Sequence, residues 1–132
     1  MIPLMYSYFI MTWEGINQRK FPRVNYKCLI RVAKGEREEV IETHTENVGA
    51  GGICVILEKD FELFENVSLK VFLEDSENPI FCNGTIVWVV KRHPTTQAET
   101  LKYDTGIEFR DIAEEDKARI SRLVESLLKS GT

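Results

Sequence analysis

The sequence predicts a mostly-β domain in which six strands form a small antiparallel barrel and one helix follows at the C-terminus. Two patterns lead to this fold class. Apolar and polar residues alternate with a period of two in several runs before residue 110, and apolar residues recur at helical spacing after it. The length of 132 residues suits one domain with its own core. Short turns between the runs favour antiparallel pairing, and barrel closure would remove exposed strand edges.

The first strand is expected over residues 23–32, where Tyr26, Cys28, Ile30 and Val32 alternate with polar residues. The other strands are expected at residues 39–46, 53–57, 67–73, 80–90 and 103–109. The third of the six is apolar on both faces and therefore predicts a central strand.

Two further local features come from the second half of the chain. Gly84 lies inside the fifth expected strand, where a glycine often marks a bulge or bend. Apolar spacing predicts an amphipathic helix over residues 112–129. Asp111 and Glu114 have the spacing of a capping-box variant at its start.

The charge is unevenly distributed. The net charge of −4 disfavours DNA, RNA or an anionic membrane as a partner of the whole protein. Residues 17–34 nevertheless hold six basic side chains and no acidic one, so the remainder of the chain is strongly acidic. The six are Arg19, Lys20, Arg23, Lys27, Arg31 and Lys34. This segment indicates a local site for an anion.

Cysteine usage and the N-terminus bear on the compartment. Cys28, Cys54 and Cys82 are widely spaced and form no zinc motif, which predicts buried free thiols in a reducing compartment. Residues 1–10 are too short for a membrane span and lack the basic start of a secretory signal. We therefore expect a cytoplasmic protein. Residues 1–17 are expected to be an arm, either an upstream extension of the start site or a segment that packs on a partner, and residues 18–132 form the domain.

The sequence offers little for catalysis or metal binding. The glycine cluster Asn47–Gly52 leads into a strand, whereas a nucleotide-binding loop leads into a helix whose N-terminus holds phosphate. His44 and His93 have no ligand or base partner at suitable spacing. The acidic trio in the helix start complements the helix dipole. Trp88 is expected in the core, with a place beside a ligand as the alternative.

The segment RKFPR is different, because two arginines, Arg19 and Arg23, flank Pro22 immediately before the first strand. Proline disfavours helix for the residue before it, so the segment is extended or turned. It is either a solvated basic linker or an anion clamp. A guanidinium can bind phosphate bidentately, stack on a base, and donate twice to the O6 and N7 edge of guanine.

Together, these segments resemble the PilZ domain family. Arg19-xxx-Arg23 and Asn47-x-Gly49-x-x-Gly52 are similar to its RxxxR and [D/N]xSxxG motifs. Residues 83–89, NGTIVWV, and 103–109, YDTGIEF, are similar to two later strands of the family. The resemblance covers residues 18–128.

The resemblance implies a six-stranded antiparallel split barrel with a flanking C-terminal helix, and binding of the bacterial second messenger cyclic di-GMP. Arg19 and Arg23 would bind phosphate and guanine, and Asn47 would accept from the guanine Watson–Crick edge. Gly52 would allow close approach to the ligand, and Lys20 would add charge. Gly49 stands where the motif has serine, so one hydroxyl is missing at the expected site.

Three functions follow as hypotheses. The first is a non-enzymatic cyclic di-GMP receptor and adaptor, in which ligand binding orders the arginine-bearing segment and a downstream protein partner detects the new surface. The alternative is a degenerate PilZ domain that serves as a protein-interaction module in motility or pilus systems. Alanine at both Arg19 and Arg23 separates them, because a receptor loses its ligand response whereas a module keeps its partner. An enzyme is disfavoured, since no metal set or general base has suitable spacing. No cofactor is expected.

Overall fold

The structure, a computed structural model, describes residues 22–34, 40–73, 78–94, 96 and 100–130. The expected N-terminal arm, residues 1–17, lies outside the described residues, as do Arg19 and Lys20.

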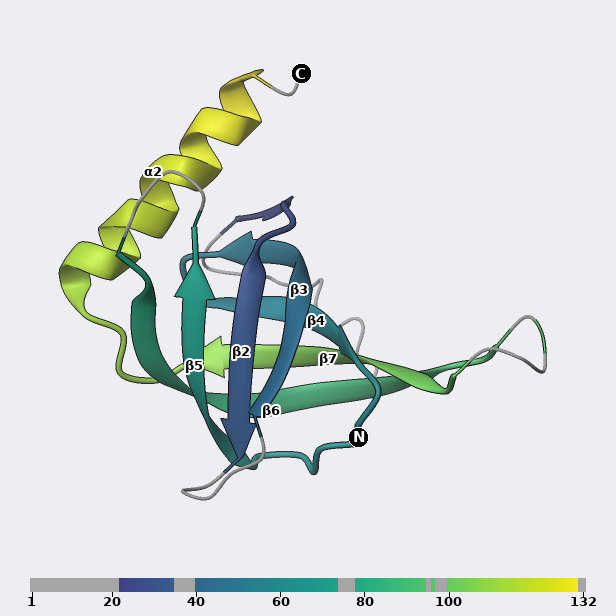
Figure 1. The fold of residues 1–132 in the computed structure, drawn as a ribbon. Coiled ribbons are helices and arrows are strands. Elements are labelled where there is room, and N and C mark those ends of the chain that lie inside the picture. Colours follow the sequence, from purple (N-terminus) through teal and green to yellow (C-terminus); the bar gives the residue numbers. More distant parts are fainter. Residues whose placement is uncertain (1–21, 35–39, 74–77, 95, 97–99, 131–132) are drawn as a thin grey trace, which may run out of the picture.

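The described chain forms a closed antiparallel barrel with one helix after it (Figure 1). The elements are β1 (Arg23–Asn25), β2 (Leu29–Lys34), β3 (Val40–Gly49), β4 (Gly52–Leu57), β5 (Asn66–Phe72), β6 (Ile80–Arg92), β7 (Lys102–Phe109) and α2 (Glu114–Ser130). The strand order is β1-β3-β2-β5-β6-β7-β4, and β4 pairs with β3 to close the barrel. β1 and β2 follow one another along β3, so the seven strands occupy six positions. The predicted six-stranded barrel is confirmed.

The prediction of one continuous strand over residues 23–32 is wrong, and the side chain of Thr45 on β3 explains the break. Thr45 Oγ1 accepts a hydrogen bond from the backbone N–H of Cys28 at 3.0 Å and donates to the carbonyl of Tyr26 at 2.6 Å. The β3–β4 register also shifts between Thr45 and Asn47. A hydroxyl that is 1% exposed therefore replaces part of the backbone ladder and separates β1 from β2.

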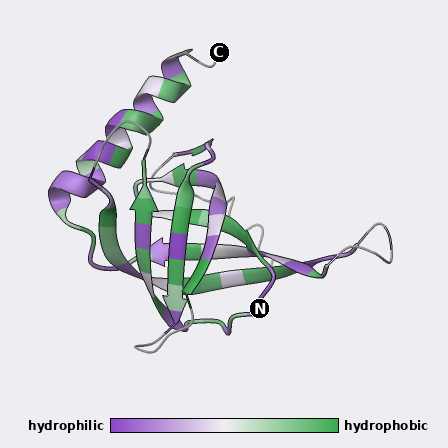
Figure 2. Ribbon diagram, in the orientation of Figure 1, coloured by the Kyte–Doolittle hydropathy of each residue, from purple (hydrophilic) through white to green (hydrophobic). Residues whose placement is uncertain are grey.

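The core lies inside the barrel, as period-two burial requires. On β2 and β5, the side chains of Ile30, Val32, Leu69 and Val71 are buried. Their neighbours along each strand are more polar, and Figure 2 shows the resulting alternation of hydrophobic and hydrophilic residues on these strands. The second expected strand runs longer than predicted and ends at Gly49.

The bulge expected at Gly84 lies elsewhere on β6. Gly84 pairs regularly with Val67 and Phe109, and the β6–β7 register shifts between Ile86 and Trp88. A Cβ at residue 84 would lie 2.6 Å from Cγ2 of Ile107. Gly84 is therefore explained by close packing inside the barrel and not by a bend.

The C-terminal helix α2 confirms the predicted amphipathic helix. Its buried residues Ile120 and Val124 join the core, and it packs against β1 and β3. Its first turn carries the acidic trio of Glu114, Glu115 and Asp116. Among the described residues, no helix is both long and apolar enough to cross a membrane.

The expected cap, Asp111, does not cap this helix. Its two carboxylate oxygens accept from the backbone N–H and the side-chain amide of Asn83, each at 2.7 Å, and these bonds lower the pKa of Asp111. Asp111 thus fastens the segment before α2 to β6. The first helical hydrogen bonds instead run to the carbonyl of Ala113.

Replacement of Thr45 by valine should destabilise the fold by about 1–3 kcal/mol, because the Cys28 N–H loses this acceptor inside the protein. Urea unfolding measures the change in the free energy of unfolding. Thr105→Val is the matched control, since the equally buried Thr105 hydroxyl bonds only to Tyr103 of its own strand. Equal losses for the two variants would contradict the role given to Thr45.

Candidate functional site

Strands β1, β3 and β4 bring the candidate residues of two distant motifs onto one outer face of the barrel. Arg23 pairs with Gly49, and Asn25 pairs with Asn47. Val24 and Val48, which alternate with them, pack in the core. Because successive side chains of a strand point to opposite faces, Arg23 and Asn47 point outward. The described part of the predicted site therefore does come together, although its members are 24 residues apart in sequence.

Arg23 and Asn47 contact each other directly. Arg23 Nη1 donates to Asn47 Oδ1 at 3.5 Å, at the long end of the hydrogen-bonding range. Both side chains are partly buried. A weak bond of this kind keeps the guanidinium and the amide side by side.

The two described glycines of the motif have different neighbours. A Cβ at Gly49 would lie 2.7 Å from the carbonyl oxygen of Pro22 and 2.8 Å from Cγ of Arg23. A Cβ at Gly52 would overlap the carbonyl oxygen of Ile107 on β7. Packing of β1 on Gly49 and of β7 on Gly52 is thus sufficient to explain both glycines.

The face continues from β3 across β4 and β7 to β6. Asn47 pairs with Cys54, Cys54 with Gly106, and Gly106 with Trp88. A Cβ at Gly106 would overlap three atoms of the Trp88 indole, so the ring lies directly on the glycine backbone. Trp88 is half-buried on this outer face, and its expected place in the core is wrong. The row from Asn47 to Trp88 crosses three strand spacings of roughly 4.8 Å, or about 14 Å along the curved barrel surface.

The thiol of Cys54 lies between Asn47 and Gly106 and is 6% exposed. Burial is the largest cause that raises the pKa of this thiol to about 11, followed by the carboxylate of Asp104, and Arg23 acts in the opposite direction. The thiol is therefore neutral near pH 7 and adds no negative charge to the face. All three cysteines are buried and free, as predicted. Burial likewise raises the pKa of Cys82 to about 12.

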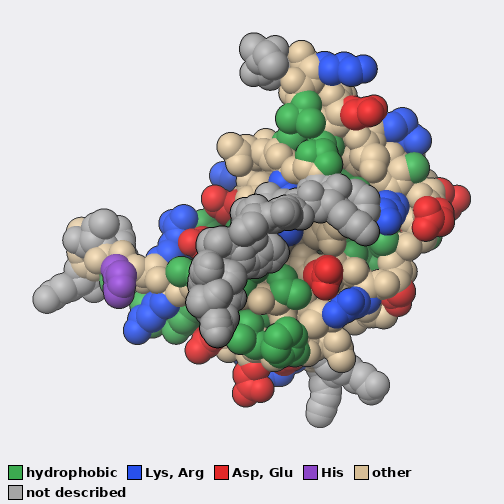
Figure 3. Space-filling view, turned by 180° about the vertical axis from the view of Figure 1, so that it is seen from behind, with side chains coloured by type: hydrophobic (Ala, Val, Ile, Leu, Met, Phe, Trp, Pro, Cys, Tyr) green, Lys and Arg blue, Asp and Glu red, His purple; other side chains and the backbone are tan. Residues whose placement is uncertain are grey.

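Figure 3 shows the molecule from behind, where basic side chains flank the projecting hairpin of β6 and β7. On this hairpin Arg92 Nε lies 3.1 Å from Asp104 Oδ1. Asp104 pairs with Ile56 and Glu108 pairs with Gly52, so each carboxylate is two residues from the Cys54 row. Each also has a cationic partner, because Arg110 Nη1 lies 3.5 Å from Glu108 Oε1.

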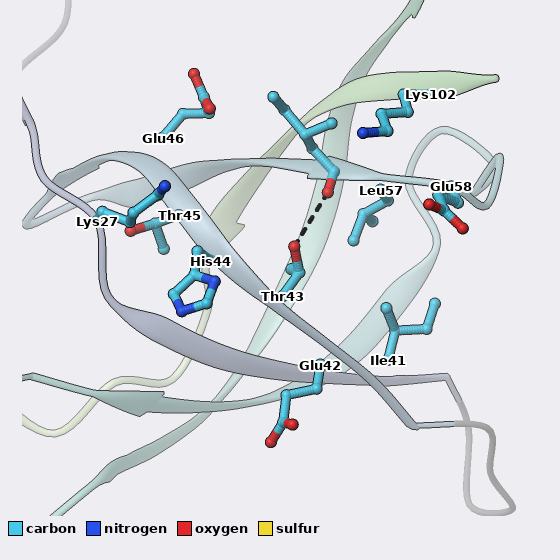
Figure 4. Close-up of a pocket in the computed structure, with 11 residues that line it drawn as sticks. Lys27, Ile41, Glu42, Thr43, His44, Thr45, Glu46, Leu57, Glu58 and Lys102 are labelled. Atoms are coloured by element: carbon cyan, nitrogen blue, oxygen red, sulfur yellow. Dashed lines mark hydrogen bonds between the residues drawn. The ribbon is translucent and has the colours of Figure 1, made fainter. Parts of the chain in front are cut away.

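A groove of about 400 Å³ opens beside this face, where β3 and β4 diverge beyond Thr45 (Figure 4). Thr43 Oγ1 bridges the two strands with a 3.2 Å hydrogen bond to the carbonyl of Ile56. The lining includes the charged side chains of Lys27, Lys102, Glu42, Glu46 and Glu58, together with the imidazole of His44. This balance gives no preference for an anion, and the groove contains neither Arg23 nor Asn47.

In the part of the chain that the structure describes, neither histidine has an arrangement suited to catalysis. His44 and His93 are exposed, as a solvated role for them predicts. Within the described ranges, no group of three or more His, Cys, Asp or Glu side chains could hold a metal ion.

With the fold and this face established, comparison with known proteins identifies the family. The sequence matches the model of the PilZ domain over residues 17–126. The chain therefore belongs to the PilZ domain family. None of the curated proteins compared with this sequence matches it.

Solved structures of similar fold include three bacterial proteins. The PilZ domain of YcgR from Escherichia coli, solved with c-di-GMP, has 10% sequence identity and a TM-score of 0.66, covering 87% of this chain and 95% of that chain. MotI/DgrA, an inhibitor of motility from Bacillus subtilis, has 22% identity and a TM-score of 0.67, covering 87% and 54%. MrkH of K. pneumonia in its apo state has 14% identity and a TM-score of 0.69, covering 88% and 55%. The chain spans about half the length of MotI and MrkH.

Sequence reasoning missed the pair formed by Trp88 and Gly106. Alternation within residues 80–90 assigned Trp88 to the core, and the bulge between Ile86 and Trp88 turned it outward. The signal that could have found it is Gly106 itself, because a glycine inside a strand marks a place where another group approaches the backbone closely.

Proposed function

We propose that this chain is a non-enzymatic receptor for cyclic di-GMP and that the ligand binds on the outer face formed by β1, β3, β4, β7 and β6. The observation that carries the proposal is the contact between Arg23 and Asn47, which joins the two motif segments at 3.5 Å. Membership of the PilZ domain family supports it. So does the fold shared with the YcgR domain, which was solved with c-di-GMP.

The chemistry of the face fits the chemistry of this ligand. Cyclic di-GMP carries two anionic phosphates and two guanines. The guanidinium of Arg23 can donate to a phosphate or to the O6 and N7 edge of a guanine. The Asn47 amide can accept from the guanine N–H groups through the oxygen that now accepts from Arg23. The neutral Cys54 thiol leaves the surface between them without repulsion for an anion.

Trp88 extends the proposal to the second guanine. Its indole lies against the backbone of Gly106, and Trp88 is half-buried on the outer surface of the barrel. Bases stack on aromatic side chains. The row of paired residues from Asn47 to Trp88 crosses three strand spacings, about 14 Å along the barrel surface, and a ligand with two guanines has a second base to place along it. We therefore assign one guanine to Arg23 and Asn47 and the other to Trp88.

Ligand binding would be transmitted to a protein partner through strand β1. This strand carries Arg23 on its outer side, packs Val24 toward the core, and contacts α2. A ligand bound to Arg23 would hold β1 more firmly between β3 and α2, and a protein partner would detect the resulting surface. Arg19 and Lys20 are proposed as additional contacts on the basis of the motif.

A protein-interaction module is the second candidate, and one surface favours it. On the outer side of β5 and β6, Phe81 is 64% exposed, and Lys70 Nζ lies 5.2 Å from the ring centroids of both Phe81 and Phe72. Exposed aromatic side chains flanked by cations are common in protein interfaces. If the wild-type protein binds no cyclic di-GMP at low salt, the receptor function fails and the protein-interaction module is the function that the surface supports.

Calorimetric titration with cyclic di-GMP tests the receptor. We expect micromolar or tighter affinity for the wild type that weakens as salt rises. Arg23→Ala should weaken binding by about tenfold to a hundredfold, because hydrogen bonds to charged groups contribute roughly 1.5–3 kcal/mol. Arg31→Ala is the control. Arg31 lies outside this face and forms an ion pair with Glu42, with an Nε–Oε2 distance of 2.8 Å. The variant should bind cyclic di-GMP as tightly as the wild type does. Equal affinity of Arg23→Ala and wild type would refute the site.

Trp88→Leu should weaken binding by roughly fivefold to a hundredfold, because base stacking on an aromatic ring contributes about 1–3 kcal/mol. The same titration measures it. Phe81→Leu makes the same kind of change near the start of β6, where Phe81 pairs with Lys70 of β5, and should leave the affinity unchanged. If both variants bind as tightly as the wild type, Trp88 is no part of the site.

A further inference from the structure

Gly49 occupies the position at which the motif has serine, and the structure shows what a side chain there would meet. A Cβ would lie 2.7 Å from the carbonyl oxygen of Pro22, 2.8 Å from Cγ of Arg23 and 3.5 Å from its Cα. Real Cβ atoms essentially never approach other atoms closer than 3.0 Å. The nearest atom belongs to the backbone, so rotation of a side chain cannot relieve the contact.

The backbone of Gly49 does not itself require glycine. Gly49 is the last residue of β3 and pairs with Arg23 and with Gly52. Its φ lies outside the left-handed range, so residues with side chains could adopt its conformation. Glycine is needed at this position for space, because Pro22 and Arg23 at the start of β1 lie against it.

The Arg23 contact has a consequence for the guanidinium. Cγ is the second carbon of the side chain, and a displacement of it carries along the Nη1 that bonds Asn47. The present position of Arg23 and a side chain at residue 49 therefore exclude each other. A serine would have to push β1 away from β3, and β1 is only three residues long.

We propose that Gly49 is a positioning residue that lets β1 pair with β3 and so holds Arg23 beside Asn47 before any ligand arrives. The docked arginine takes the place of the serine hydroxyl of the motif. This inference rests on the proposed function and deepens it, because a site ordered in advance spends less of its binding free energy on ordering itself. Serine at residue 49 accordingly weakens binding, although it restores the motif.

Titration with cyclic di-GMP of the full chain tests the inference. Gly49→Ala and Gly49→Ser should each weaken binding at least about tenfold through displacement of Arg23. In an Arg23→Ala background, Gly49→Ala should cost markedly less, since residues that act through each other are not additive. Tighter binding by Gly49→Ser, or additive losses in the double variant, would overturn the proposal.

Gly84→Ala is the matched control, because its Cβ would meet Ile107 and Leu69 inside the barrel and would not touch Arg23 or Asn47. It should lower the melting temperature and leave the affinity of the folded protein unchanged. Gly49→Ala should weaken the affinity of the folded protein, whatever its effect on the melting temperature. A role of Gly49 in stability alone would lower the melting temperature of both variants and the affinity of neither, which would overturn the positioning role.

Amide hydrogen exchange of residues 23–25 without ligand separates this inference from the proposed function. Exchange should be faster in Gly49→Ala than in the wild type, because β1 is displaced from β3. If the wild type binds no cyclic di-GMP, the proposed function fails, and faster exchange in the variant still supports the positioning of Arg23 by Gly49. Unchanged exchange would overturn that positioning.

Discussion

The antiparallel pairing of β1 with β3 is the interaction on which the rest of the site depends. β3 pairs along one edge with β1 and β2 and along the other with β4, and the second pairing closes the barrel. The same strand therefore organises the core and carries Asn47. Because β1 is short, its position depends on the space above Gly49 and on its contact with α2. The absence of a side chain at residue 49 thus determines where the guanidinium of Arg23 lies.

Glycines allow close packing at three places on the face. β1 packs against Gly49, the backbone of β7 packs against Gly52, and the ring of Trp88 packs against Gly106. In each case a missing side chain brings another group close to the strand. The result is a row of paired residues with an arginine at one end, an indole at the other and a neutral thiol between them. Such a surface suits a flat, anionic ligand better than the adjacent groove with its mixed charges.

The sequence alone predicted the parts of the fold that short-range patterns control. Period-two runs identified the strands, and helical spacing identified α2 to within two residues at its start.

The errors arose where distant residues decide the local structure. The hydroxyl of Thr45 divides β1 from β2, and the bulge after Ile86 turns Trp88 outward. Asn83 holds the carboxylate of Asp111 that the capping pattern assigned to the helix. Arg23, Asn47, Gly49 and Gly52 were found from motifs, whereas the mutual exclusion of Arg23 and a side chain at Gly49 required the structure.

Arginine placement before ligand binding is the central claim, and the notion that the ligand first orders this segment is its direct competitor. Nuclear magnetic resonance of the ligand-free protein distinguishes them through cross-strand proton contacts between residues 23–25 and 47–49. Our account predicts that contacts between Arg23 and Gly49 and between Val24 and Val48 are present without ligand and persist when cyclic di-GMP is added. Contacts that appear only after cyclic di-GMP is added would contradict it.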